Sequence, residues 1–286
     1  MDLHRTTKEN QSFIMADKAV VLITGGNTGL GYEAIKALCQ SSSTYEILLG
    51  SRSLEKGQKA ASQIQNEVPN TTSTISVIQV DISSDSSIEA ATEQIQTKFG
   101  KLDILVNNAG ASFDREIQTG NLSIREAFNK SWDTNVAGAQ VITTSMAPLL
   151  LQSKNPRLLF ITSGTSALTE TERHDHPAFA RINASPAAGW PKDEGMNPLT
   201  SYRSSKTGLN MLMTQWHRLL KEDGVKVWAI SPGFLATGLG GIEAEQLKKM
   251  GARDPSEGGK FIKDVVEGKR DGETGKVIRA EMVQPW

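Results

Sequence analysis

The sequence is poor in cysteine and in long apolar runs, and each shortage excludes a class of protein. Cys39 is the only cysteine among 286 residues, so no disulfide can form within the chain, which favours a reducing compartment. No apolar run approaches the roughly 20 residues that cross a bilayer, so we expect no membrane-spanning helix. Residues 1–15 lack the apolar middle of a secretory signal and are expected to form a polar extension. These features favour a cytoplasmic protein.

The chain also lacks an excess of charge of either sign. Its 31 Lys and Arg residues face 32 Asp and Glu residues, for a formal net charge of −1. Such a balance creates no field that attracts nucleic acid or an anionic membrane, so neither is expected as a partner. Hydrophobic residues make up 38% of the chain and charged residues 22%, an ordinary globular composition. A chain of this length buries enough surface to need neither a disulfide nor a metal for its core.

What the sequence does contain is a regular alternation of apolar runs and helical patterns. The predicted strands are 19–24, 46–50, 75–80, 102–106, 157–162 and 225–230, and helices are predicted over 29–40, 54–68 and 86–99. Apolar residues fill most strand positions, which is typical of a parallel sheet covered on both faces. The pattern predicts an α/β fold with a doubly wound, Rossmann-like parallel sheet, in a single domain over 16–286.

Two segments interrupt this alternation. Residues 164–200 connect a strand to a helix and contain several prolines and a His-Asp-His sequence. Connections of this length inside a compact domain are usually functional or mobile. Residues 238–257 begin glycine-rich and continue charged, with Lys248 and Lys249 in a pattern typical of a solvated helix face. We expect both segments to be inserts around a substrate site, the second as a candidate lid.

A glycine-rich sequence, TGGNTGLG, joins the first predicted strand to the first predicted helix over 24–31. Glycine lets the backbone approach a diphosphate closely, and the free N–H groups of a helix N-terminus stabilise its charge. A tight turn without a ligand is the alternative. The position between the first strand and the first helix favours a dinucleotide site.

The end of the second predicted strand indicates which nicotinamide cofactor is used. A carboxylate at this point binds the free ribose hydroxyls of NAD, whereas an Arg accommodates the 2′-phosphate of NADP. The strand is followed by Arg52, with no carboxylate before Glu55. The Arg52 guanidinium can form paired, charge-assisted bonds to a phosphate. A solvated surface Arg is the alternative, but we predict NADP(H) as the cofactor.

Tyr202 and Lys206 are spaced for acid catalysis beside a nicotinamide cofactor, whose hydride can reduce a carbonyl. Hydride reaching a carbonyl carbon requires a proton for the oxygen, and a free tyrosine has a pKa of about 10. A lysine four residues along the same helix face lies close to the phenol, where its charge lowers that pKa. Tyr32 and Lys36 have the same spacing. They directly follow the glycine loop, far from the reactive end of a dinucleotide, so Tyr202 is the predicted acid.

Several motifs occur together in one order. They are TGGNTGLG (24–31), Asp81-Ile82, NNAG (107–110), Asn135, Ser163, YRSSK (202–206) and SPGFLAT (231–237). In this order they resemble the short-chain dehydrogenase/reductase family, from about Ala19 to the C-terminus. The separation of Ser163 from Tyr202 exceeds that of compact members and resembles carbonyl-reductase-like members, in which an insert before the tyrosine contributes to the substrate mouth.

The resemblance implies a catalytic tetrad. Ser163 would donate a hydrogen bond to the substrate oxygen, although Thr162, Thr165 and Ser166 are nearby hydroxyls. Tyr202 would be the general acid and base, with Lys206 lowering its pKa and binding the nicotinamide ribose. Asn135 would interrupt a helix and hold a water that relays protons; a surface Asn is the alternative.

The resemblance also implies the cofactor contacts. The adenine and phosphate end would be held by Gly25, Asn27, Thr28, Gly29, Leu30, Arg52, Asp81 and Ile82. The ribose and nicotinamide would be held by Asn108, Ala109, Gly110, Tyr202, Lys206, Pro232, Gly233, Leu235 and Thr237.

The resulting prediction is an NADP(H)-dependent oxidoreductase acting on a small-molecule carbonyl or alcohol. A cofactor-binding protein without turnover and a non-redox cyclase or eliminase remain alternatives. Phe179, Trp190, Met196 and Phe234 are candidates for an apolar substrate mouth. No metal is predicted, because the His174-Asp175-His176 sequence has no further ligand at a useful spacing. Homodimer, homotetramer and monomer all stay open.

Overall fold

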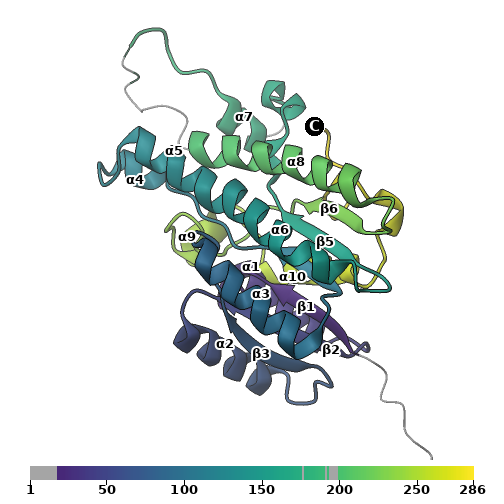
Figure 1. The fold of residues 1–286 in the computed structure, drawn as a ribbon. Helices are drawn as coiled ribbons and strands as arrows, with labels where there is room; N and C mark the ends of the chain where they lie inside the picture. The colour runs from purple at the N-terminus through teal and green to yellow at the C-terminus, as the bar shows by residue number, and fades with distance from the viewer. Residues whose placement is uncertain (1–17, 176, 191, 193–198) are drawn as a thin grey trace, which may run out of the picture.

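The computed structural model describes residues 18–175, 177–190, 192 and 199–286. The predicted extension at 1–15 and the residues His176 and Met196 lie outside the described residues. Figure 1 shows a central sheet between two layers of helices. The sheet is parallel throughout, in the order β3-β2-β1-β4-β5-β6-β7. Its strands are β1 (Ala19–Ile23), β2 (Tyr45–Ser51), β3 (Thr74–Gln79), β4 (Ile104–Asn107), β5 (Arg157–Ile161), β6 (Lys226–Ile230) and β7 (Val277–Ile278).

Each face of the sheet is covered by helices and has its own apolar core. One face packs against α1 (Gly29–Cys39), α2 (Leu54–Glu67) and α10 (Pro255–Val266). The other packs against α3 (Asp85–Phe99), α6 (Gly138–Leu150) and α8 (Thr200–Leu220). Successive strand residues alternate between the two cores, Val20 and Leu22 facing one and Val21 and Ile23 the other. Burial on both faces explains why these strands are apolar at most positions.

The remaining helices lie near the carboxyl ends of the strands or along the outer layer. They are α4 (Asp114–Gln118), α5 (Ile124–Trp132), α7 (Pro177–Asn183) and α9 (Ala244–Lys249). A π-helical turn (Asp133–Ala137) joins α5 to α6, so that the two form one long helix with an interruption. Within the 164–200 segment, two short 3-10 turns (Gly164–Ser166 and Thr169–Glu172) precede α7. The 238–257 segment contains α9 and the start of α10.

The predicted α/β fold is confirmed. All six predicted strands are present within two residues of their expected limits, and the three predicted helices match α1, α2 and α3. The sequence analysis missed β7, a two-residue edge strand too short to show a pattern. Cys39 is buried in α1 as a small apolar residue, as expected. Within the described part of the chain, no helix has the length and apolar character needed to cross a membrane.

Candidate active site

The glycine loop forms a turn between β1 and α1 that requires glycine at several positions. Gly25 and Gly29 have φ angles of 63° and 56°, in the left-handed region that favours glycine. A Cβ on Gly31 would collide with the carbonyl oxygen of Gly25. At the start of α1, the N-cap residue Thr28 makes no side-chain capping bond. The first N–H groups of the helix are therefore available to a phosphate, which is the fit expected for a dinucleotide.

The predicted NNAG motif holds this loop in place. The Thr24 hydroxyl accepts hydrogen bonds from the backbone N–H groups of Asn108 (3.0 Å) and Ala109 (2.9 Å). The Asn108 amide nitrogen donates in return to the carbonyl oxygens of Thr24 (2.8 Å) and Gly25 (3.2 Å). The side chain of Asn108 thus ties β4 to the glycine loop, a role that its position in the sequence did not reveal.

The residues predicted to hold the adenine end lie along the carboxyl ends of β2 and β3. Arg52 is exposed directly after β2. The Asp81 carboxylate accepts two bonds at Oδ1, from the backbone N–H and hydroxyl of Ser83 (3.0 and 2.7 Å). Burial raises the pKa of Asp81, but the hydrogen bonds from Ser83 and the charge of Arg52 outweigh burial. The net effect is a lowered pKa, so the carboxylate is ionised at neutral pH. Ile82 is buried, and its carbonyl oxygen leaves no room for a Cβ on Gly138.

The SPGFLAT segment returns to the glycine loop from the other side. A Cβ placed on Gly29 would lie 3.4 Å from the Thr237 Cβ, so the two segments face each other closely. Leu235 is buried against the start of α10, whereas Phe234 is exposed. Gly233 has a φ of 96°, and the Arg253 guanidinium covers the space that a side chain there would need.

Asn135 sits in the π-helical turn and is almost fully buried. Its Oδ1 accepts a bond from the Ala111 N–H (2.9 Å), and its Nδ2 donates to the Ala111 carbonyl (2.8 Å) and the Ser205 hydroxyl (2.9 Å). The wider turn directs the side chain inward, toward the NNAG strand end. Asn135 is therefore not the surface residue of the alternative interpretation, and the helix is interrupted where the sequence analysis expected.

Lys206 lies beside the same strand end. A Cβ on Gly110 would be 3.0 Å from the Asn135 Oδ1 and 3.2 Å from the Lys206 Nζ, so the two polar groups flank the Gly110 backbone. The Lys206 ammonium donates to the carbonyl oxygen of Ile161 at 2.8 Å. Burial lowers the pKa of Lys206 to about 8, because a buried ammonium loses its hydration.

Tyr202 is one helical turn before Lys206, whose Nζ is 5.8 Å from the centre of the phenol ring. Burial raises the pKa of Tyr202 to about 12, and the hydrogen bond with Ser163 lowers it only in part. Burial outweighs this hydrogen bond, so the phenol is protonated at neutral pH. The lowering of this pKa by Lys206 stays a prediction.

Ser163 follows β5 and caps the 3-10 turn that begins at Gly164. Its hydroxyl is 2.9 Å from the Thr165 hydroxyl and accepts the Thr165 N–H at 3.1 Å. Ser166 and Thr162 point elsewhere: they bond to Asn210 of α8. Ser163 is hydrogen-bonded to Tyr202, and its role toward a substrate oxygen stays a prediction.

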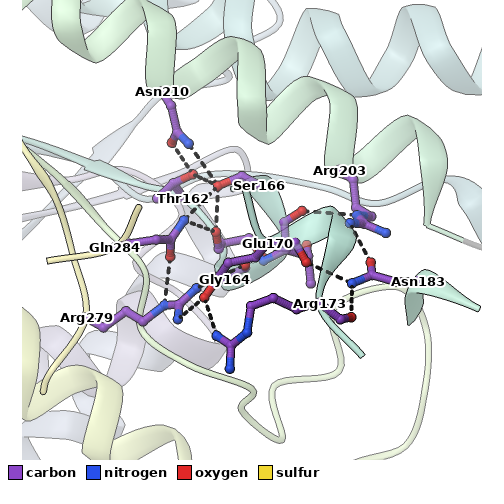
Figure 2. A network of polar contacts seen from close by, with 12 residues as sticks. Thr162, Gly164, Ser166, Glu170, Arg173, Asn183, Arg203, Asn210, Arg279 and Gln284 are labelled. Atoms are coloured by element: carbon purple, nitrogen blue, oxygen red, sulfur yellow. Dashed lines mark hydrogen bonds and ion pairs between the residues drawn. The ribbon is translucent and has the colours of Figure 1, made fainter. Parts of the chain in front are cut away.

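A polar network joins the residues around Ser163 to the segment that follows β7; Figure 2 shows its members. The carbonyl oxygen of Ser163 accepts bonds from the Ser166 hydroxyl (2.6 Å) and from Nε2 of Gln284 near the C-terminus (3.2 Å). Arg279 donates to the Gly164 carbonyl (3.3 Å) and to Gln284 (2.9 Å), and forms an ion pair with the buried Glu170. The sequence analysis missed this network, because none of its C-terminal members belongs to a motif.

The sequence analysis also considered the Tyr32-Lys36 pair and the histidines near Asp175. The Tyr32 hydroxyl donates to Glu67 of α2 at 2.9 Å, and Lys36 forms an ion pair with the same carboxylate (2.5 Å). This second Tyr-Lys pair therefore joins α1 to α2. His174 is exposed, and Asp175 pairs with Arg173. Among the described residues, no three His, Cys, Asp or Glu side chains are grouped to hold a metal.

Comparison with known proteins finds short-chain dehydrogenases both by family model and by sequence similarity. The family model for short chain dehydrogenases matches residues 19–173 and 182–248. A short-chain dehydrogenase/reductase of Phoma sp (eupG) is 48% identical over 94% of this chain and 98% of its own length. One from Talaromyces stipitatus (tropE) is 45% identical over 96% of this chain and all of its own length. The crystal structure of NADPH-bound carbonyl reductase from chicken fatty liver superposes with a TM-score of 0.72 at 19% identity, covering 94% of this chain and 99% of that one.

Proposed function

This chain belongs to the short-chain dehydrogenase/reductase family, and from that premise we propose that it is an NADP(H)-dependent reductase of a small-molecule carbonyl. In the proposed reaction, hydride passes between the nicotinamide and the substrate carbon, and Tyr202 exchanges the proton with the substrate oxygen. The observation that carries the proposal is the meeting of Asn135, Lys206 and the Gly110 backbone at the carboxyl end of β4. The same sheet edge carries the glycine loop, as a dinucleotide enzyme requires.

The side chains have distinct roles in this proposal. The bound nicotinamide supplies the hydride. Ser163 donates a hydrogen bond to the carbonyl oxygen, and Tyr202 donates the proton as negative charge develops there. Lys206 binds the nicotinamide ribose and, with Asn135, returns a proton to Tyr202 through a water.

In the direction of reduction, Tyr202 has to start as the protonated phenol. A phenol with a pKa of about 12 carries its proton at neutral pH. Because so high a pKa also makes the phenol a weak acid, the Lys206 ammonium one helical turn away has the proposed role of stabilising the phenolate as the proton leaves.

The proposed acid is tested by a screen of NADPH oxidation against aromatic, aliphatic and quinone carbonyls, followed by the variant Tyr202→Phe. We expect kcat for the best substrate to fall by roughly 1,000-fold, since general acid catalysis contributes about 100- to 10,000-fold. NADPH binding, followed by cofactor fluorescence, should stay within about twofold of wild type. Near-normal kcat in this variant would refute the role of Tyr202.

The preference for NADP(H) rests on Arg52, which is exposed at the end of β2 beside the ionised Asp81. The NADPH-bound carbonyl reductase of similar fold supports the same cofactor. We expect kcat/KM to be higher with NADPH than with NADH, and Arg52→Asp to reverse the order by removing the phosphate partner and repelling the phosphate. Lys56→Asp, a charge reversal in the first turn of α2, is the matched control. Higher efficiency with NADH in the wild type would overturn the preference.

We also propose that residues 16–286 form a single catalytic domain. The single sheet supports this proposal, because its strands come from both halves of the chain. A cytoplasmic location stays a prediction, as does the absence of a nucleic-acid partner.

A further inference from the structure

The helix that carries Tyr202 begins after a residue whose side chain cannot cap it. α8 starts at Thr200, and its N-cap residue is Leu199, whose aliphatic side chain makes no capping bond. The first N–H groups of a helix have no partner within the helix and need an acceptor from elsewhere. Tyr202 occupies the third helical position, so its own N–H is one of these groups. An unsatisfied first turn would fray at the residue proposed as the proton donor.

Asp114 of α4, a distant part of the chain, accepts hydrogen bonds from two N–H groups in this first turn. Its Oδ1 accepts the N–H of Ser201 at 2.8 Å, and its Oδ2 accepts the N–H of Tyr202 at 3.0 Å. These are the second and third helical positions, whose N–H groups an N-cap side chain binds. The Asp114 side chain is 4% exposed, and the Ser112 hydroxyl donates to it at 3.3 Å. The carboxylate thus caps α8 across 88 residues of sequence.

We propose that Asp114 is a positioning residue for catalysis, which fixes the first turn of α8 and thereby the Tyr202 side chain. The proposal rests on the function proposed above for Tyr202. The next residue of α4, Arg115, donates to the carbonyl oxygen of Gly241 in the 238–257 segment. The short helix α4 thus connects the predicted lid to the catalytic helix, with neighbouring residues contacting each.

The experiment compares Asp114→Ala with two repaired variants that place the cap at its ordinary position. Asp114→Ala should lower kcat roughly 10- to 100-fold through displacement of Tyr202. Adding Leu199→Asp should restore kcat. Adding Leu199→Ser restores the cap without the charge, so it should restore kcat as well.

Glu116→Gln is the matched control, since it removes a carboxylate from the same helix that accepts neither of the two N–H groups bound by Asp114. It should leave kcat near its wild-type value. NADPH binding by cofactor fluorescence checks that each variant is folded. If Asp114→Ala keeps the wild-type kcat, or if Glu116→Gln lowers kcat equally, Asp114 is not a positioning residue.

Amide hydrogen exchange at Ser201 and Tyr202 tests the cap without any turnover. Exchange at both amides should accelerate about 10-fold in Asp114→Ala and return toward the wild-type rate with Leu199→Asp. Protected amides in Asp114→Ala would overturn the cap itself. A wild-type protein that consumes no NADPH would instead refute the proposed function, and the exchange rates would still decide whether Asp114 caps α8.

Discussion

At the scale of single residues, burial sets the chemistry of the candidate site more strongly than the pairing of Tyr202 with Lys206. A helical spacing of four residues predicts that the two side chains share a face, and they do. It does not predict that the Lys206 ammonium is held by the Ile161 carbonyl at 2.8 Å. Nor does it predict that both groups lose most of their hydration, which favours the neutral phenol and the neutral amine.

The pKa values of these two groups predict the pH dependence of the enzyme. Lys206 has its pKa lowered to about 8, so it is protonated below that pH and loses its charge above it. We expect kcat/KM for NADPH, which reports groups of the free enzyme, to be level near neutral pH and to fall above about pH 8. Tyr202, with a pKa of about 12, stays protonated over this range.

Initial rates between pH 6 and 10, with circular dichroism at each pH to confirm folding, would measure this profile. A level profile up to pH 10 would mean that Lys206 keeps its proton or that its charge is not used.

At the scale of elements, the site depends on where regular structure is interrupted. The chain from Ile124 to Leu150 has a helical pattern throughout, but the π-helical turn at Asp133–Ala137 breaks it and directs Asn135 inward. The resemblance to a family predicted this interruption; the pattern of apolar residues did not. In the same way, the start of α8 is visible in the sequence only as the end of a long loop, because its cap lies in α4.

At the scale of the whole molecule, the parallel sheet brings the strand ends together, and the C-terminal segment closes one side of the site. Arg279 and Gln284 follow β7 and reach the Ser163 loop. Through Glu170 the same network includes the 164–200 segment. The long connection before α8 is therefore anchored at its start by the last residues of the chain.

The ion pair between Glu170 and Arg279 should contribute measurably to global stability. Glu170 is 3% exposed and Arg279 18%, whereas Arg173, which pairs with the same carboxylate, is 40% exposed. Arg279→Ala should lower the free energy of unfolding by about 3 kcal/mol, because it leaves a buried charge with one weak partner. Arg173→Ala, the matched control, should cost less than about 1 kcal/mol.

Urea denaturation of both variants would measure the difference. Equal losses of unfolding free energy in the two variants would show that the burial of Arg279 does not strengthen its ion pair with Glu170. The Arg279 variant should also have a lower kcat than the Arg173 variant, since only Arg279 contacts the Gly164 carbonyl.

The sequence by itself determined the features that depend on neighbouring residues. The apolar strands, the glycine loop with its left-handed Gly25 and Gly29, and the shared face of Tyr202 and Lys206 all follow from local sterics and helical geometry. Because parallel strands order their carboxyl ends along one edge, the sequence also indicated where a cofactor would bind.

Only the tertiary structure decided which distant groups complete the site. Asp114 reaches α8, Asn108 reaches the glycine loop, and Gln284 reaches Ser163. Asp114 and Gln284 are ordinary polar residues in their local sequence, and the NNAG motif does not show which groups Asn108 contacts. These contacts form because buried N–H and C=O groups need partners once the chain has packed. The spacing of residues within one segment does not show them.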